Sequence, residues 1–260
     1  MKNAIYDSDL TDTQWEFLMP MLPKAKTFGR PPTDRRLVIN AILYVLKGGI
    51  AWRLLPKTYP PCKTVYHIFR AWTLDKTWAA LNDALRICVR LDAGREKQPT
   101  AAILDSQSVK SDGHGGEVGY DAGKRIKGRK RHVLVDTLGL LLGVMVTPAS
   151  CPERDGGQKV LSQVAGWFSG LRKVWVDGGY TGENFANWVK ERWPRLQVEV
   201  VKRCDDVEGF AVLPKRWIVE RTFGWLMQHR RLARDYERTE SSAEAWIQLA
   251  MIRIQLRRLA

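Results

Sequence analysis

Apolar residues recur at helical spacing through the first hundred residues of the chain. The pattern predicts helices from Thr11 to Leu18, from Thr33 or Asp34 to Gly48, from Pro61 to Trp72, and from Asp75 or Thr77 to about Leu91. Thr, Asp and Ser side chains cap helix starts, whereas proline and glycine interrupt or end helices. An all-α region is therefore predicted before residue 92.

The third predicted helix carries basic and aromatic residues on its exposed side, namely Lys63, Thr64, Tyr66, His67 and Arg70. A helix, a turn and a basic helix in this order are typical of a helix-turn-helix, whose second helix enters the major groove of DNA. A plain helical bundle with aromatic core residues explains the same pattern. The sequence leaves both interpretations open.

Residues 92–99 form the best candidate linker because they are polar and contain glycine and proline. Beyond them, strands are predicted over residues 101–109, 132–136, 140–148, 174–176 and 198–202. Helices are predicted from Asp155 to about Trp167 and over residues 183–193, 214–231 and 241–258. The residues from Asp136 to Gly139 are expected to form a hairpin turn. This order predicts a mixed α/β layout after the linker.

The charge balance points to a polyanionic partner. The chain has 260 residues with 42 Lys and Arg against 28 Asp and Glu, a net charge of +14. The hydrophobic fraction of 45% is that of a globular protein rather than a disordered one. A large basic surplus concentrates polyanions, of which nucleic acid is the commonest. Solubility alone, or contact with anionic lipid, is the alternative.

The cysteines and the apolar segments predict a cytoplasmic protein. Cys62, Cys88, Cys151 and Cys204 include no CxxC pair, so neither a zinc ribbon nor a disulfide framework is indicated. The first residues lack the apolar stretch of a signal peptide. The longest apolar runs, such as residues 138–146, are too short to cross a bilayer, and no membrane partner is expected.

Three acids lie at or within apolar segments that are expected to be buried. Asp105 ends a predicted strand, Asp177 ends another, and Glu220 lies inside a predicted helix. Buried carboxylates are costly unless they are paired or bind metal, and Mg²⁺ prefers oxygen ligands. Two such ions can clamp the attacking and leaving oxygens at phosphorus. Taken singly, each aspartate could cap a turn and Glu220 could be a solvated helix residue.

Four ordered motifs carry a resemblance to a known family. They are DSQSVK at 105–110, GYDAGKRIKGRKRHVLVDTLG at 119–139, VDGGY at 176–180 and RWIVERTFGWL at 216–226. Together they resemble DDE transposases, most closely the insertion sequence five family. The segment from Asp12 through Pro56 resembles the helical domain that precedes the nuclease in those enzymes. The resemblance spans nearly the whole chain.

The resemblance implies a ribonuclease H-like mixed sheet flanked by helices, preceded by an all-α, helix-turn-helix-like domain. The expected domains are residues 1–98, which bind the terminal inverted repeats, and residues 99–260, which carry out catalysis. Asp105, Asp177 and Glu220 are then the catalytic triad that binds Mg²⁺ or Mn²⁺. The expected partner is double-stranded DNA, both transposon ends and target, bound by a homodimer.

The wider group of such transposases has a tyrosine, arginine, glutamate and lysine signature around the last acid. Arg216 and Glu220 match it and lie one helical turn apart. Leu213 and Met227 stand at the tyrosine and lysine positions, so no role is carried over to them. The nearby run from His229 to Arg231 is a candidate source of the missing cation. An ordinary ion pair is the alternative for Arg216 and Glu220.

A basic run lies between the first two predicted strands and comprises Lys124, Arg125, Lys127, Arg129, Lys130 and Arg131. Because it leads into a strand beside Asp105, we expect it to contact the DNA backbone. A solvated, flexible arm is the alternative. With Lys63, Tyr66, His67, Arg70 and Arg216, these residues complete the predicted DNA contacts.

The predicted activity is two-step transposition on one site. A metal-activated water cleaves the phosphodiester at the transposon end, and the freed 3′-hydroxyl attacks target DNA. A ribonuclease H-like nuclease or junction resolvase would hydrolyse DNA without joining it. A helix-turn-helix regulator with an inactive nuclease domain is the alternative from another class, and the three intact acids argue against it.

Overall fold

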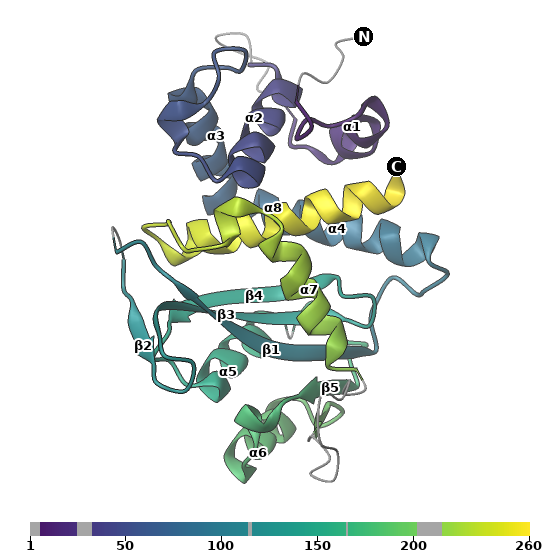
Figure 1. Ribbon diagram of the computed structural model, residues 1–260. Helices are drawn as coiled ribbons and strands as arrows, with labels where there is room; N and C mark the ends of the chain where they lie inside the picture. Colours follow the sequence, from purple (N-terminus) through teal and green to yellow (C-terminus); the bar gives the residue numbers. More distant parts are fainter. Residues whose placement is uncertain (1–5, 25–32, 114–115, 165, 202–214) are drawn as a thin grey trace.

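A computed structural model describes residues 6–24, 33–113, 116–164, 166–201 and 215–260, and it contains a helical layer stacked on a mixed sheet (Figure 1). Helices α1, α2 and α3 form the upper layer. The long helices α4 and α8 lie beneath them and rest on the sheet. Helices α5 and α6 cover the opposite face of the sheet. The protein is therefore mixed α/β with an all-helical N-terminal region, as predicted.

The N-terminal helices begin and end at local signals in the sequence. They are α1 (Asp12–Leu18), η1 (Met19–Met21), α2 (Arg35–Gly48), η2 (Trp52–Leu54), α3 (Cys62–Leu74) and α4 (Thr77–Asp92). Thr11 forms a capping box with Gln14 at the start of α1, and Asp34 caps α2. Gly49 ends α2 in the left-handed conformation with φ 67°, which a residue without Cβ adopts at little cost. The predicted turn at residues 29–32 lies outside the described residues.

The sheet combines antiparallel and parallel pairing. Its strands are β1 (Ala101–Lys110), β2 (Gly119–Asp121), β3 (Ile126–Asp136), β4 (Leu141–Pro148), β5 (Lys173–Val176) and β6 (Gln197–Val200). Strand β3 pairs antiparallel with β1, β2 and β4, whereas β5 pairs parallel with β1 and β6. The remaining elements are α5 (Glu153–Val164), η3 (Gly178–Tyr180), α6 (Glu183–Arg192), α7 (Trp217–Met227), η4 (Arg230–Leu232) and α8 (Glu240–Leu259).

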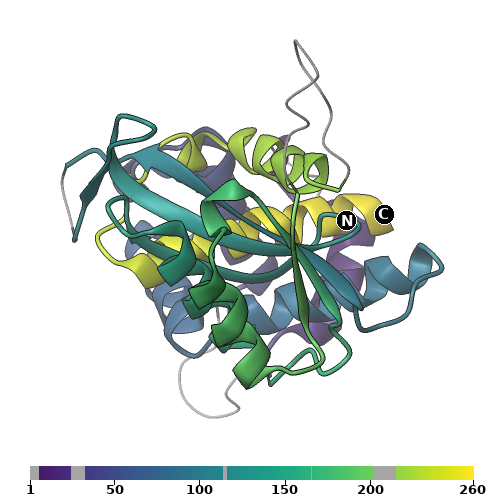
Figure 2. The ribbon, with the colours of Figure 1, turned by 90° about the horizontal axis from the view of Figure 1, so that it is seen from below.

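Alternate residues of the central strands face two hydrophobic clusters. Ile103 and Val133 face α7, α8 and the N-terminal helices, whereas Leu104 and Leu134 face α5 and α6. Figure 2 shows α5 and α6 in front of the sheet and α8 behind it. The first cluster is one connected set of side chains whose members include Leu10 near the N-terminus, Ile103 of β1 and Leu256 of α8. The N-terminal helices and the sheet therefore share one core. The domain boundary at residues 98 and 99 stays a prediction.

The hairpin turn from Asp136 to Gly139 is confirmed. The Asp136 carboxylate accepts hydrogen bonds from the Leu138 and Leu140 backbone N–H groups at 2.9 Å each, and Gly139 has φ 80°. Arg90 of α4 donates to the same carboxylate at 2.6 Å, inside the core. The turn is therefore fixed both locally and by a helix of the N-terminal region.

The predicted bounds of three elements were wrong: those of β3, of α5, and of α7, which ends at Met227 rather than Arg231. Strand β3 begins at Ile126 rather than His132, because Arg129, Lys130 and Arg131 are buried in it and have partners within the protein, whereas the charged run was taken for a loop. Helix α5 begins at Glu153, so Asp155 lies in its first turn instead of capping it, and Trp167 lies beyond its end. Within the described residues, no helix has the length and apolar character that a bilayer-spanning segment needs.

A half-buried carboxyl of α8 supports the outer edge of β4. Glu244 Oε1 accepts a hydrogen bond from the Val146 backbone N–H at 3.1 Å. Burial raises the Glu244 pKa from 4.5 to about 7, although that hydrogen bond opposes the shift. The protonated carboxyl therefore prevails in the fold below neutral pH.

This raised pKa predicts a pH-dependent stability. A group whose folded pKa exceeds its unfolded pKa stabilises the fold below the unfolded value, and this contribution disappears as pH rises through the folded value. The free energy of unfolding of the wild type should therefore fall between pH 5 and 8. We expect Glu244→Gln, which keeps the hydrogen-bond acceptor but does not titrate, to make this fall smaller by on the order of 2 kcal/mol. Urea unfolding across this range measures it, with exposed Glu183→Gln as control. Parallel pH profiles for wild type and Glu244→Gln would contradict the assignment.

Candidate active site

Two of the three predicted acids stand side by side at one edge of the sheet. Asp105 lies in β1 and Asp177 directly follows β5. The two strands are parallel neighbours, and Ile103 pairs with Trp175. Each aspartate follows its paired residue by two positions, so both side chains lie at the same level and on the same face of the sheet.

The third acid approaches from α7, which packs against β1. Glu220 lies in the first turn of that helix, one turn after Arg216. One guanidinium nitrogen of Arg216 lies 3.7 Å from Asp105 Oδ2, 3.8 Å from Asp177 Oδ2 and 3.7 Å from Glu220 Oε1. Two oxygens that each lie 3.8 Å or less from the same nitrogen cannot be further apart than twice that distance. The structure thus brings Asp105, Asp177 and Glu220 together as one acidic cluster.

The acidic cluster carries more negative charge than the neighbouring basic side chains balance. Burial, and then the charge of Asp177, raises the pKa of Asp105 from 3.8 to about 6. Burial, and then Glu153, raises the pKa of Asp177, although Arg216 opposes the shift. The buried Tyr180 hydroxyl lies near these carboxylates and has no hydrogen-bond partner within the described residues. A further cation would relieve this repulsion.

The chemistry of the cluster fits a hard divalent cation. Its donors are carboxylate oxygens, which Mg²⁺ and Mn²⁺ prefer over nitrogen or sulfur. Across the ranges that the structure describes, no three His, Cys, Asp or Glu side chains are arranged closely enough to hold a metal ion as they stand. Arg216 lies between the three acids in this arrangement, so it balances part of their charge.

A fourth acid, Glu153, adjoins the cluster and was missed in the sequence. Its Oε1 accepts hydrogen bonds from Ser106 Oγ at 3.0 Å and from Lys124 Nζ at 3.2 Å. Lys124 also donates to the Ser106 backbone oxygen at 3.4 Å. Placing the start of the helix at Asp155 put Glu153 in a loop. Its only sequence signal is an acid in the first turn of a helix, which is common at helix starts.

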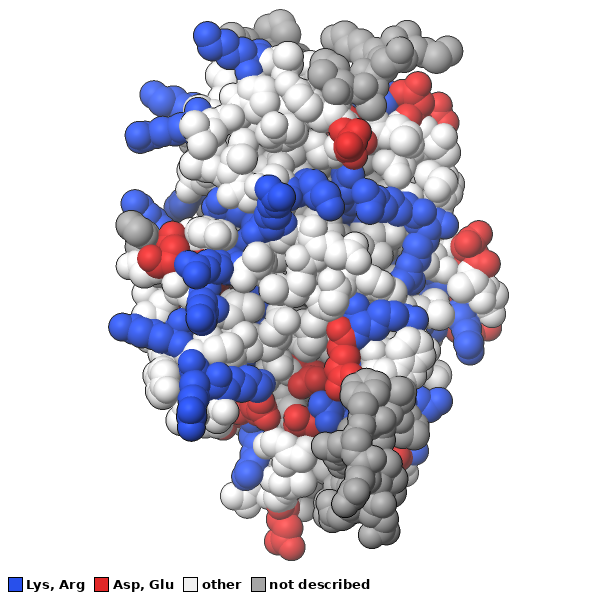
Figure 3. Space-filling view, viewed as in Figure 1, with Lys and Arg blue, Asp and Glu red and all other residues white. Residues whose placement is uncertain are grey.

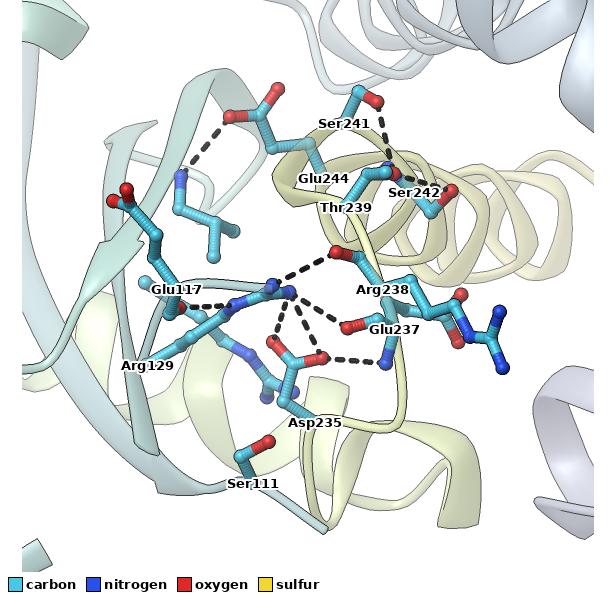
Figure 4. A network of polar contacts seen from close by, with 12 residues as sticks. Ser111, Glu117, Arg129, Asp235, Glu237, Arg238, Thr239, Ser241, Ser242 and Glu244 are labelled. Atoms are coloured by element: carbon cyan, nitrogen blue, oxygen red, sulfur yellow. Dashed lines mark hydrogen bonds and ion pairs between the residues drawn. The ribbon is translucent and has the colours of Figure 1, made fainter. Parts of the chain in front are cut away.

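The basic run divides into an exposed part and a buried part. Lys124, Arg125 and Lys127 are exposed, but Arg129, Lys130 and Arg131 are buried in β3. The three buried residues have partners within the protein. Arg129 pairs with Asp235 and donates to three backbone oxygens. Lys130 pairs with Asp121 and donates to the Cys151 backbone oxygen, and Arg131 donates to the Leu232 backbone oxygen. Figure 4 shows the guanidinium of Arg129 among these partners.

This burial corrects the prediction that the whole run contacts DNA. Arg129, Lys130 and Arg131 would each have to abandon buried partners to reach a phosphate, leaving a polar group unpaired in the core. Within the basic run, only Lys124, Arg125 and Lys127 remain available as DNA contacts. Likewise, His229 is buried and Arg231 pairs with Glu237, so neither supplies the missing cation of the signature. Leu213 lies outside the described residues.

The proposed recognition helix has the predicted exposure. Lys63, Tyr66, His67 and Arg70 are exposed on α3, whereas Val65, Phe69 and Trp72 are buried. Tyr66 packs edge-on against Trp52 at 5.5 Å between ring centroids. The polar face is thus free on the surface, and its contact with DNA stays a prediction.

Comparisons with known proteins identify the two halves of the chain. Residues 96–254 match the family described as the transposase DDE domain, and residues 10–82 match the family described as putative transposases of the IS4/5 family. A relative from Burkholderia cepacia, an uncharacterized 16.2 kDa protein of insertion element IS402, is 30% identical over 126 residues. The match covers 46% of this chain and 82% of that protein. A DDE domain implies the ribonuclease H-like fold, with which the observed mixed sheet agrees.

Two adjacent glycines provide a test of the acidic site. A Cβ on Gly179 would overlap Glu153 Oε2 and lie 3.1 Å from Asp177 Oδ1, whereas a Cβ on Gly178 would meet nothing within 4 Å. We expect Gly179→Ala to displace the Glu153 carboxylate and lower metal-dependent DNA cleavage about 10²-fold, because small misplacements cost alignment. Gly178→Ala should keep near wild-type cleavage. Cleavage assays with melting curves compare them, and equal activity of the two variants would contradict the prediction.

Proposed function

The chain belongs to the DDE transposases of IS4/5 type, enzymes that cut and transfer DNA, and from this premise we propose its reaction. The protein binds the terminal inverted repeats of an insertion sequence, cleaves the phosphodiester at each end and joins the 3′-hydroxyl to target DNA. The observation that carries the proposal is the meeting of Asp105, Asp177 and Glu220 around Arg216 at one sheet edge. We expect a homodimer to act on both ends in the bacterial cytoplasm.

The three acids of the cluster would hold Mg²⁺ or Mn²⁺. When bound, such ions activate water for attack and stabilise the oxygen that leaves phosphorus. The raised pKa of Asp105 is consistent with this role, because a site that repels its own negative charge favours a cation. Asp105 and Asp177 are held by hydrogen bonds from the backbone N–H groups of Ser106 and Gly179, so their carboxylates are oriented before substrate arrives.

The basic residues beside the acids would position the DNA strand. Lys124 is partly exposed and is held by Glu153 and the Ser106 oxygen, next to Asp105. A phosphate that enters the site would meet this ammonium first. Arg216 would contribute a second cation once the acids bind metal. No step requires a covalent bond between protein and DNA, so no serine or tyrosine nucleophile is assigned.

Substitution of the acids tests this reaction. Asp105→Asn, Asp177→Asn and Glu220→Gln should each lower strand cleavage about 10³-fold or more, since each removes a carboxylate that would hold the metal ions. Binding to end DNA should stay close to wild type. The decisive assay is the joining of a pre-cut end to target plasmid in Mg²⁺. Cleavage without joining would favour the nuclease or resolvase, and full activity of any variant would remove that residue from the site.

The exposed face of α3 generates a separate prediction about recognition. In the full-length protein, His67→Ala and Arg70→Ala should each weaken the preference for end DNA over random DNA, because a lost base contact costs about 1–3 kcal/mol. Lys190→Ala, on the exposed surface of α6, is the control. Competition binding at fixed salt measures the preference. If both α3 variants keep the wild-type preference, α3 is part of a plain helical bundle.

A further inference from the structure

A band of Lys and Arg side chains crosses the face of the protein above the acidic cluster. Figure 3 shows this band between the upper helices and the sheet, and it shows the acids below it. In this region η4 contacts α2, α7 and α8, and α7 also contacts α8. None of these elements belongs to the basic run or to the proposed recognition helix.

Five cations define this basic band: Lys47 of α2, Arg221 of α7, Arg230 of η4, and Arg257 and Arg258 of α8. Lys47 donates to the Gln228 backbone oxygen at 3.4 Å, and Arg230 packs against Gly49. The charges of Lys47 and Arg257 both lower the pKa of the buried His229, so both lie close to it. The five residues come from four elements but form one surface.

Two arginines of the basic band, Arg221 and Arg258, contact the same two groups of the protein. The guanidinium groups of Arg221 and Arg258 stack over Trp225 at 4.4 and 4.7 Å. Both also donate to the Leu138 backbone oxygen, at 3.2 and 3.4 Å. These contacts hold two positive charges next to one another.

The basic band lacks the negative charges that would normally accompany it. Within the described ranges, none of the five cations has a carboxylate oxygen within 4.0 Å, whereas Arg86, Arg90 and Arg129 each have one. Neighbouring like charges destabilise the free protein, so the arrangement favours an external anion.

The position of the basic band suggests which anion it accommodates. Helix α7 carries Glu220 of the acidic cluster and, directly after it, Arg221 of the basic band, and it then runs about 10 Å further to its end at Met227, where η4 follows with Arg230. The distance from Glu220 to the end of α7 is about a third of the helical repeat of B-DNA, which is about 34 Å. Helix α3 packs on α2 and α8 beyond the band. A row of cations between a recognition surface and a cutting site matches the regular charge of a duplex backbone.

We propose that the basic band binds the phosphate backbone of the transposon-end duplex between α3 and the acidic cluster. This inference rests on the proposed function and adds a path for the DNA. The band fixes the length of duplex between the recognised sequence and the cleaved bond, and it reads no bases. It therefore contributes affinity and alignment rather than sequence preference.

The test replaces the three exposed members, Lys47, Arg230 and Arg257, with Gln in the full-length protein. Arg221 and Arg258 are kept because they stack on Trp225. Binding to an end duplex is titrated with salt, and each lost phosphate contact should flatten the log–log slope by about 0.9. The triple variant should therefore differ from wild type by about 2–3 units, with an unchanged preference for end over random DNA.

A matched control separates this effect from a general loss of charge. Lys159→Gln, Lys190→Gln and Arg195→Gln together remove the same charge from exposed residues on the α5 and α6 side. They should leave the slope within about 0.5 of wild type. The melting temperature of the free band variant should not fall, because like-charge repulsion is reduced. The single variant Lys47→Gln, with an expected change of about 0.9, serves if the triple variant does not fold.

The outcomes distinguish the two proposals. An unchanged slope in the band variant, or equal flattening in the control variant, overturns the proposal that the basic band binds phosphates. The proposed function is unaffected by that result as long as the wild type cleaves and joins end DNA. Failure of the wild type to prefer or process end DNA overturns the proposed function itself. A flattened slope confined to the band variant supports the path.

Discussion

The burial of helix α8 is the constraint on which the rest of the structure depends. This helix lies between the N-terminal helices and the sheet, and its Trp246 stacks on Phe69 of α3 at 4.6 Å. Two of its polar residues have partners on opposite sides of the helix: the buried Arg253 donates to the Ser8 and Asp7 backbone oxygens, and the half-buried Glu244 accepts a hydrogen bond from β4. Because one helix completes the core for both layers, the proposed recognition surface and the acidic cluster are held in a fixed relation.

The acidic cluster illustrates a site that the fold stabilises at an energetic cost. Glu153 brings a fourth carboxylate next to Asp177, and burial adds to the repulsion. Arg216 and Lys124 offset part of it. Sites with raised carboxyl pKa values are frequently functional, because their charge is completed by a ligand rather than by the protein. The family of the chain agrees with that interpretation.

The positive charges of the protein serve two different purposes. In β3 they are structural, since Arg129 joins the loop before α8 to the sheet through Asp235 and three backbone oxygens (Figure 4). In the basic band they have no carboxylate partners within the described residues. Proximity in the sequence therefore does not decide which cations can meet a phosphate. Their partners decide it, because a buried and paired guanidinium is stabilised where it lies.

The sequence by itself determined the features that local chemistry controls. The caps at Thr11 and Asp34, the turn from Asp136 to Gly139 and the meeting of Asp105 with Asp177 follow from residue types and strand order. The catalytic role of those acids stays a prediction. Tertiary structure alone decided the position of Glu153, the burial of the basic run and the basic band. These depend on partners far apart in the chain, such as Arg129 with Asp235 and Lys47 with Gln228. Electrostatic interactions act through space, and no local pattern encodes which charges the fold brings together.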